Sequence, residues 1–521
     1  MKKRPVLLTA FTLAFALIAS ACASNVAIEK PLSNLAAYEN QKLDWETCYE
    51  DFQCTDLRVP IDYADLTVGT FKLALLRYRA QDQKNRIGSL IVNPGGPGGS
   101  GVDYAFNAEY VFDPDVLDRY DIVGFDPRGV NRSAPIECLT DEETDASYAA
   151  DAKPDTEAEL EKSLAESKEF INKCQEANEY LDHYSTANSA RDMDILRAAL
   201  GDKKINFFGK SYGTYLGTLY AQFFPDKVGR MVLDGALDPN ISILEQNISQ
   251  AKGFDVALGA FLDDCAKQSD CPIPANRQEA IAAIIALFTT AATNPLPRKT
   301  KVENDDRVAT ESLIVLGTAS ALYDDVDGWP KLRTAFLEGQ QGHGDTFLDL
   351  ADQYSGRSSD GTYASNELDS GAIIDCLDWP ETRGIEKTKA DAQRFTDAAP
   401  IFGPYLAYTN ITCKFLKPPA KDKFTRTTNK ITAINTAPII VIGTTRDPAT
   451  PYDWAVGLHK IFTTSTLISL DADGHTVPHG TVGELCTRGY SVMAGYWDDP
   501  AKTAEAVDTE GWMHTGDLAT M

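Results

Sequence analysis

The chain has 521 residues, of which 43% are hydrophobic, so it can bury a large core and is long enough for two or three domains. Its formal net charge of -27 repels phosphate groups, which disfavours nucleic acid and anionic membrane surfaces as partners. Acidity can also attract cationic ligands, although a solvated acidic surface is the commoner explanation.

The N-terminus has the pattern of an export signal. Lys2, Lys3 and Arg4 precede an apolar run over residues 6–18, which is too short to favour a membrane-spanning helix. Small residues then lead to Cys22, as in a bacterial lipobox, so residues 1–22 are predicted to be a signal peptide with Cys22 as the lipidated residue. Ordinary cleavage nearby, releasing a soluble protein, is the alternative.

The cysteines fit an exported protein with disulfides. Cys48/Cys54 and Cys265/Cys271 are close enough in sequence to close small loops, and order along the chain leaves Cys138/Cys174 and Cys376/Cys413. Cys486 is left without a partner. No pair has the spacing of a metal site with histidines nearby, so we expect no bound metal or cofactor.

Apolar segments that are typical of strands recur along the chain, and helical patterns alternate with several of them. The predicted strands are residues 57–59, 71–77, 89–92, 121–125, 205–208, 230–233, 439–442 and 466–470, and the clearest helices are 190–200 and 212–224. Such alternation indicates an α/β protein with a mostly parallel sheet covered on both faces.

A glycine-rich loop, residues 93–101, follows the strand that ends at Val92. It lacks the Gly-Lys-Ser/Thr ending of a phosphate-binding loop and is not an ordered G-x-G-x-x-G before a helix. Its exposed backbone N–H groups can instead stabilise a developing negative charge, and Gly96 is the donor that we expect.

The stretch 205–213 places Ser211 between Gly209 and Gly213, directly after an apolar strand and before a helical pattern. This G-x-S-x-G arrangement is typical of a nucleophile elbow, in which flanking glycines let a strained strand-to-helix turn form. The alternative is an ordinary glycine-flanked turn with a solvated serine. As a nucleophile, Ser211 would have the N–H of Tyr212 as a second donor for a developing oxyanion.

Residues 239–430 differ in character, with amphipathic helical patterns and polar loops but no comparable strands. We predict a helical lid inserted between two parts of one core, residues 40–238 and 431–476. A lid in this place would cover the carboxyl ends of the strands, where open α/β sheets bind ligands.

A nucleophilic serine needs a base, and the base needs an acid to orient it. Asp447 and His475 each lie in a turn after a predicted strand, and the order Ser211, Asp447, His475 is that of α/β-hydrolases. His479 and Asp453 are the rival base and acid. The sequence thus predicts an α/β-hydrolase fold with a helical lid insertion and this catalytic triad.

The chain resembles the α/β-hydrolase exopeptidases related to proline iminopeptidases, and within them the secreted bacterial tripeptidyl aminopeptidases. The resemblance covers about residues 40–476 and rests on the motifs at 93–101, 124–133, 209–213, 447–451 and 474–476. It implies a serine hydrolase that releases short units from free peptide N-termini, with peptide substrates as partners. Recognition of the ammonium group would need carboxylates in the lid, and Asp375 and Asp378 are the candidates.

Two other classes of function remain open, because relatives of this kind include carboxylesterases that act on small esters. A catalytically silent binding protein of the cell envelope could also keep the fold without turnover. Residues 477–521, by contrast, resemble a piece of an acyl-CoA synthetase of the adenylate-forming superfamily, with Asp517 at the position that binds the nucleotide ribose. No phosphate loop precedes this piece, so it is expected to be a fusion without ligase activity.

Overall fold

The computed structural model describes residues 28–521 except 303–304, 381–383, 422–423, 425, 427–428, 433, 471–482, 488–512 and 520–521. Residues 483–487 and 513–519 are described by their backbone only. The predicted signal peptide with Cys22, and the predicted base His475 with its rival His479, lie outside the described residues.

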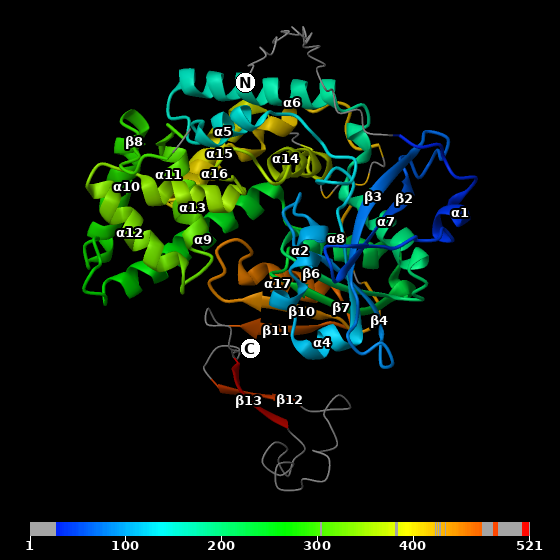
Figure 1. Ribbon diagram of the computed structural model, residues 1–521. Coiled ribbons are helices and arrows are strands. Elements are labelled where there is room, and N and C mark those ends of the chain that lie inside the picture. The colour runs from blue at the N-terminus through cyan, green and yellow to red at the C-terminus, as the bar shows by residue number, and fades with distance from the viewer. Residues whose placement is uncertain are drawn as a thin grey trace, which may run out of the picture.

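Nine strands form one sheet at the centre of the protein (Figure 1). Their order is β1-β2-β3-β5-β4-β6-β7-β10-β11. Their bounds are β1 (Glu46–Cys48), β2 (Phe52–Pro60), β3 (Thr70–Tyr78), β4 (Gly88–Asn93), β5 (Tyr120–Phe125), β6 (Ile205–Lys210), β7 (Val228–Asp234), β10 (Ile440–Thr444) and β11 (Thr466–Leu470). Each of the eight predicted strands overlaps one of these, with 439–442 beginning one residue before β10. Strand β1 was missed because it is short and partly exposed.

The sheet is antiparallel at its N-terminal edge, where β1, β2, β3 and β5 pair in turn. From β5 through β4, β6, β7, β10 and β11 all pairs are parallel. The carboxyl ends of β4, β6, β7, β10 and β11 therefore meet along one edge, and the predicted α/β architecture with a mostly parallel sheet is confirmed.

Several helices lie outside the region between β7 and β10, before the first strand or between strands in sequence. They are α1 (Leu35–Glu39), α2 (Gly101–Phe106), α3 (Ala108–Val111), α4 (Pro114–Arg119), α5 (Asp141–Ala149), α6 (Glu157–Ala177), η1 (Leu181–His183), α7 (Thr186–Ala199), α8 (Tyr212–Phe223), η2 (Pro225–Lys227) and α17 (Tyr452–Ile461). Helix α7 begins four residues before the predicted start, because Ser185 caps it through the N–H of Asn188.

The region between β7 and β10 is almost entirely helical and lies beside the carboxyl edge of the sheet (Figure 1). It contains α9 (Ile243–Cys265), α10 (Arg277–Thr293), α11 (Glu311–Ala321), α12 (Gly328–Gln340), α13 (Asp345–Ser355), α14 (Glu367–Asp378), α15 (Ile385–Ala398), α16 (Gly403–Leu406), η3 (Thr409–Lys414) and the short strands β8 (Leu296–Pro297) and β9 (Val308–Ala309). Most of its apolar side chains form a core of their own around Phe261, Phe336 and Phe347, whereas Ile373 and Leu377 of α14 pack in the core of the sheet. None of the described helices is both long and apolar enough to cross a membrane.

The four predicted disulfides are all present: Cys48–Cys54, Cys138–Cys174, Cys265–Cys271 and Cys376–Cys413. The last of these ties α14 to η3. Four disulfides are typical of proteins that fold in an oxidising compartment.

Strands β12 (Gly483–Thr487) and β13 (Met513–Ala519) lie near the C-terminus and pair with each other in an antiparallel sheet. This pair does not join the nine-stranded sheet and is drawn apart from it in Figure 1. The predicted free thiol of Cys486 belongs to β12, whose side chains are not described, so it stays a prediction.

Candidate active site

Ser211 sits on a strained turn between β6 and α8. Its φ of 51° and ψ of -124° lie in a region that non-glycine residues rarely occupy. A methyl group added at Gly209 would lie 2.5 Å from the carbonyl oxygen of Gly213, and one at Gly213 would lie 2.7 Å from Asn93 Oδ1. Only glycine fits at both positions, so the strained turn depends on the two residues that the G-x-S-x-G motif supplies.

The Ser211 hydroxyl makes no capping bond to helix α8, although Ser211 occupies the N-cap position. Its own N–H is held by the carbonyl oxygen of Asp234 at the end of β7, at 2.9 Å. The N–H of Tyr212 belongs to the first residue of the helix, where backbone donors have no partner within the helix. The turn therefore leaves the hydroxyl and a nearby backbone donor available to a substrate.

The glycine-rich loop packs directly on this turn. A methyl group at Gly95 would lie 2.8 Å from the carbonyl oxygen of Lys210 and 2.9 Å from Ser211 Cβ. Gly96, the predicted second donor, is the next residue and has a φ of +105°. Because β4 and β6 are parallel neighbours, with Asn93 paired to Gly209, this loop and the Ser211 turn leave the sheet side by side.

The motif at residues 124–133 supports this loop from behind. The Asp126 carboxylate accepts hydrogen bonds from the Ser100 hydroxyl at 2.5 Å and from the N–H of Val102 at 3.2 Å, where α2 begins. Arg128 is fully buried and forms two bonds of 2.7 Å to Asp192 of α7. These residues hold the scaffold of the site together.

Asp447 lies in the loop after β10 and is held by that loop itself. Its Oδ1 accepts the N–H groups of Ala449 and Thr450 at 2.9 and 2.8 Å, and its Oδ2 accepts the Thr450 hydroxyl at 2.8 Å. Burial raises the pKa of Asp447, and these hydrogen bonds oppose the rise because they stabilise the charged form. The carboxylate is thus fixed in orientation before any partner binds.

The Asp447 loop reaches back to the serine. A methyl group at Gly235 would lie 3.0 Å from Thr450 Oγ1 and 3.7 Å from the backbone nitrogen of Ser211, which places Thr450 close to the Ser211 turn. The rival acid Asp453 is exposed on the first turn of α17. Sequence reasoning missed Thr450, although its spacing of three residues from Asp447 is typical of a side chain that closes an aspartate turn.

The predicted base His475 follows β11 in sequence and lies outside the described residues, so its role stays a prediction. Thr444 and Leu470 pair at the ends of β10 and β11, and the N–H of Thr445 donates to the carbonyl oxygen of Leu470 at 2.7 Å. The chain thus leaves the sheet beside the Asp447 loop, five residues before His475.

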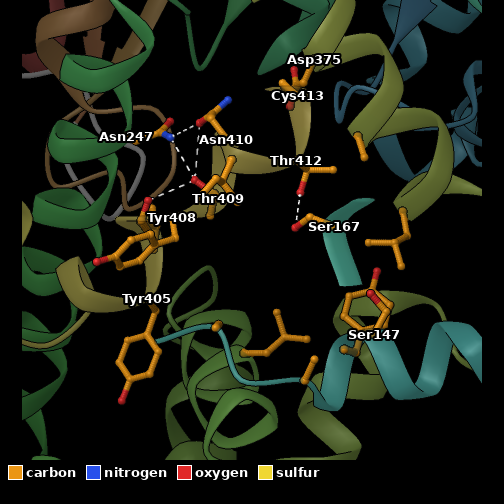
Figure 2. A pocket seen from close by; sticks show the side chains of 18 of the residues that line it. Ser147, Ser167, Asn247, Asp375, Tyr405, Tyr408, Thr409, Asn410, Thr412 and Cys413 are labelled. Atoms are coloured by element: carbon orange, nitrogen blue, oxygen red, sulfur yellow. Dashed lines mark hydrogen bonds between the residues drawn. The ribbon is translucent and has the colours of Figure 1, made fainter. Parts of the chain in front are cut away.

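A cavity of about 910 Å³ opens above the serine, between the sheet edge and the helical region. Four predicted site residues line it: Gly96, Ser211, Tyr212 and Asp375. In Figure 2, Asp375 lies beside Cys413, while Thr412 donates to Ser167 farther along the wall, at 3.1 Å. Elements of the sheet side and of the helical region therefore enclose one space.

The two predicted lid carboxylates have different surroundings. Asp375 lines the cavity, and its Oδ1 makes no hydrogen bond among the described residues. Burial raises the pKa of Asp375 to about 7, although the positive charge of Arg426 opposes the rise. Asp378 is absent from the cavity lining, and its carboxylate accepts two hydrogen bonds from Thr186. Asp375 is therefore placed to meet a ligand, whereas Asp378 faces the core.

Glu367, on the first turn of α14, is a further carboxylate that the sequence did not indicate. A methyl group at Gly96 would lie 3.1 Å from Glu367 Oε1, so this carboxylate borders the glycine-rich loop. Solvent reaches the side chain, yet the surrounding atoms raise the pKa of Glu367, and no described residue forms an ion pair or hydrogen bond with it. The proximity arises from packing of α14 on the loop, which no local pattern reveals.

One group of described residues has the composition of a metal site: Glu338, His343 and Asp345, whose ligand atoms lie within 4.8 Å of one another. None of the three lines the cavity. They join the end of α12 to the start of α13 and have no connection to Ser211.

Comparison with known proteins agrees with this geometry. The sequence profile described as alpha/beta hydrolase fold matches residues 88–479. Serine protease Hip1 of Mycobacterium tuberculosis is 37% identical over 81% of this chain and 81% of its own. Carboxylesterase B of the same species is 36% identical over 83% and 84%, and the tripeptidyl aminopeptidase of Streptomyces lividans is 32% identical over 84% and 81%. The chain belongs to the α/β-hydrolase family.

Proposed function

We propose that this protein is a serine hydrolase that releases short units from the free N-termini of peptides. The observation that carries the proposal is the position of Ser211, on a strained turn that opens into a cavity. Asp375 also lines this cavity, and its Oδ1 has no hydrogen-bond partner among the described residues. The relatives named serine protease and tripeptidyl aminopeptidase support the peptide substrate.

In the proposed reaction, Ser211 Oγ attacks the scissile carbonyl carbon while His475 removes the hydroxyl proton and Asp447 orients the imidazole. The N–H groups of Gly96 and Tyr212 stabilise the negative oxygen of the tetrahedral intermediate. Collapse breaks the C–N bond, and His475 gives its proton to the departing amine. Water, activated by His475, then attacks the acyl-enzyme and releases the short peptide as a carboxylic acid.

Asp375 and Glu367 are the groups that we propose to receive the substrate's ammonium end. Both lie on α14, both have raised pKa values, and neither carboxylate forms an ion pair with a described residue. An ammonium group would supply such a partner, and Asp375, inside the cavity, would gain more from it than the exposed Glu367 would.

The domains that we propose have the boundaries predicted from the sequence. Residues 40–238 and 431–476 would form the catalytic core, and residues 239–430 would form a lid that limits the length of bound substrate. The cavity between the sheet edge and α9, α14 and η3 supports this division.

An esterase is the second candidate, and the relative named carboxylesterase B favours it. The same serine, oxyanion donors and triad would act on an acyl ester, for which Asp375 would have no cationic partner. The response to removal of Asp375 therefore distinguishes the two candidates.

We propose that the protein acts outside the cytoplasm, as its four disulfides favour. Lipidation of Cys22 would attach it to the cell envelope, and cleavage without lipidation would release it. For residues 477–521 we propose no ligase activity, so ATP should not stimulate any reaction of the chain.

The test combines a fluorophosphonate probe with three chromogenic substrates: an aminoacyl, a tripeptidyl and a short acyl ester. We expect the probe to label Ser211 in the wild type and not in Ser211→Ala, and the peptide with a free N-terminus to react faster than its N-acetylated form. Failure of the probe to label the wild type would refute a serine hydrolase, and equal rates for the free and acetylated peptides would refute the aminopeptidase assignment.

A further inference from the structure

A buried chain of hydrogen bonds links the residue after the nucleophile to the lid helix α14. The Tyr212 hydroxyl bonds to the Thr186 hydroxyl, which donates to Asp378 Oδ2 at 2.5 Å. The N–H of Thr186 donates to Asp378 Oδ1 at 3.1 Å. Thr186 and Asp378 expose 0% and 1% of their surface and Tyr212 exposes 4%, so water does not compete for these bonds.

The three residues come from three helices that are distant in sequence. Thr186 begins α7, Tyr212 begins α8 directly after Ser211, and Asp378 ends α14. The N–H of Arg426 also donates to the carbonyl oxygen of Asp378 at 3.0 Å, and its guanidinium lies 3.5 Å from the ring centre of Trp379. The end of α14 is thus fixed to the start of α7 and, through Thr186, to the start of α8 directly after Ser211.

The hydrogen bonds of the Tyr212 side chain bear on catalysis through the backbone of the same residue. The N–H of Tyr212 is a proposed oxyanion donor, and a donor of this kind acts only when its position matches the oxyanion of the transition state. The Tyr212 side chain is anchored at its far end, so the position of its backbone depends on Thr186 and Asp378. Burial and the charge of Asp378 also raise the pKa of Tyr212 far above its usual value, which keeps the hydroxyl protonated for this bond.

We infer that Thr186 and Asp378 are positioning residues for the oxyanion hole, acting through the Tyr212 side chain, so that the lid helix helps to set the rate of catalysis. Asp378 thereby has a role other than contact with substrate. The inference rests on the proposed function, because it requires that Ser211 is the nucleophile and that the N–H of Tyr212 stabilises an oxyanion.

The test uses Tyr212→Phe, Thr186→Val and Asp378→Asn, with rates normalised to sites titrated by fluorophosphonate. We expect kcat to fall about 10-fold in each of the three with KM nearly unchanged, because only transition-state stabilisation is weakened. Affinity for an alkyl boronic acid, which mimics the tetrahedral intermediate, should fall in parallel, whereas affinity for the product peptide should not. Thr186→Ser, which retains the hydroxyl, should recover most of the rate.

Matched controls lie on the same helix. Tyr220→Phe removes a buried hydroxyl that bonds to Asp194 at 3.2 Å, and Thr218→Val removes one that bonds to the carbonyl oxygen of Thr214 at 2.7 Å. These changes should lower the melting temperature without the loss of boronate affinity. The double variant Thr186→Val/Tyr212→Phe should be no slower than the slower single variant, because both changes break the same bond.

Two results overturn the inference. If Tyr212→Phe and Thr186→Val keep wild-type kcat per titrated site, or lose it no more than the controls do, the hydrogen-bond chain is only structural. If kcat falls but boronate affinity does not, the effect does not act through the oxyanion hole. Neither result affects the proposed function, which fails if the wild type is not labelled at Ser211 or if free and N-acetylated peptides react at equal rates.

Discussion

The carboxylates at the sheet edge and those on helix α14 have opposite surroundings. At the sheet edge, Asp447 receives three hydrogen bonds from its own loop, and Ser211 is held by glycine contacts and by the end of β7. On α14, Asp375 lines the cavity and Glu367 borders the glycine-rich loop, and neither forms an ion pair with a described residue. The groups proposed for chemistry are thus fixed in advance, and those proposed for recognition are left to be completed by the substrate.

The largest expected effect is at the nucleophile. Ser211→Ala should lower turnover by a factor on the order of 10⁴ or more, because triad members act as a unit. The melting temperature should stay close to that of the wild type, since the hydroxyl has no capping role. Near-normal turnover in this variant would mean that another residue is the nucleophile, and that the sheet edge is not the catalytic side of the cavity.

The next effect tests the fixed side of the site. Asp447→Asn should lower kcat by roughly 10³-fold to 10⁴-fold, because the imidazole loses the partner that sets its tautomer and stabilises its charged form. Asp453→Asn is the matched control, since Asp453 is exposed nearby on α17. Steady-state kinetics with one peptide and one ester should show the same loss for both. A larger loss in Asp453→Asn would exchange the roles of the two acids.

Removing the charge of Asp375, the proposed recognition group on α14, should change KM. Asp375→Asn should raise KM for a peptide with a free N-terminus by roughly 30-fold or more, because the ammonium group loses a buried charged partner. KM for an uncharged ester should hardly change. Asp369→Asn, a buried aspartate of α14 that accepts the N–H groups of Cys138 and Leu139, is the control and should affect stability instead. Equal KM changes for peptide and ester would mean that Asp375 shapes the cavity without binding charge.

The smallest effect is a pH dependence of the same carboxyl. Burial raises the pKa of Asp375 to about 7, so its binding-competent, ionised form becomes scarce below that pH. The apparent KM for free peptides should therefore fall roughly tenfold between about pH 6 and pH 8, since affinity scales with the competent fraction. The dependence should vanish in Asp375→Asn. A profile that is unchanged in this variant would assign the titration to another group.

The raised pKa of Asp375 also makes the free energy of unfolding depend on pH. The folded protein keeps a proton on Asp375 that the unfolded chain has already released above its ordinary pKa, so this contribution to stability is complete at acidic pH and is lost as the pH rises through about 7. Thermal unfolding of the wild type and Asp375→Asn at pH 5 and pH 8 measures it, and Asp375→Asn should lose less stability over that interval.

The sequence predicted those features that depend on residues close together along the chain. The strands could be found because each is an apolar run, and the Ser211 turn because glycine is the only residue that fits at 209 and 213. The disulfides followed from order along the chain. The role of Asp378 could not be found in this way, because its bonds to Thr186 join segments that are far apart in sequence. Glu367 was missed for the same reason, since only the packing of α14 brings it to Gly96.

The pairing of β7 with β10, in which Val232 lies opposite Ile440, has a consequence for folding. The intervening helical region must be folded or looped out before these two strands can meet, and closing so long a loop is slow. Ser211 precedes that region and Asp447 follows it. Synthesis therefore yields the proposed nucleophile well before its proposed acid. Hydrolytic activity would then report the completion of the sheet more faithfully than helix content does.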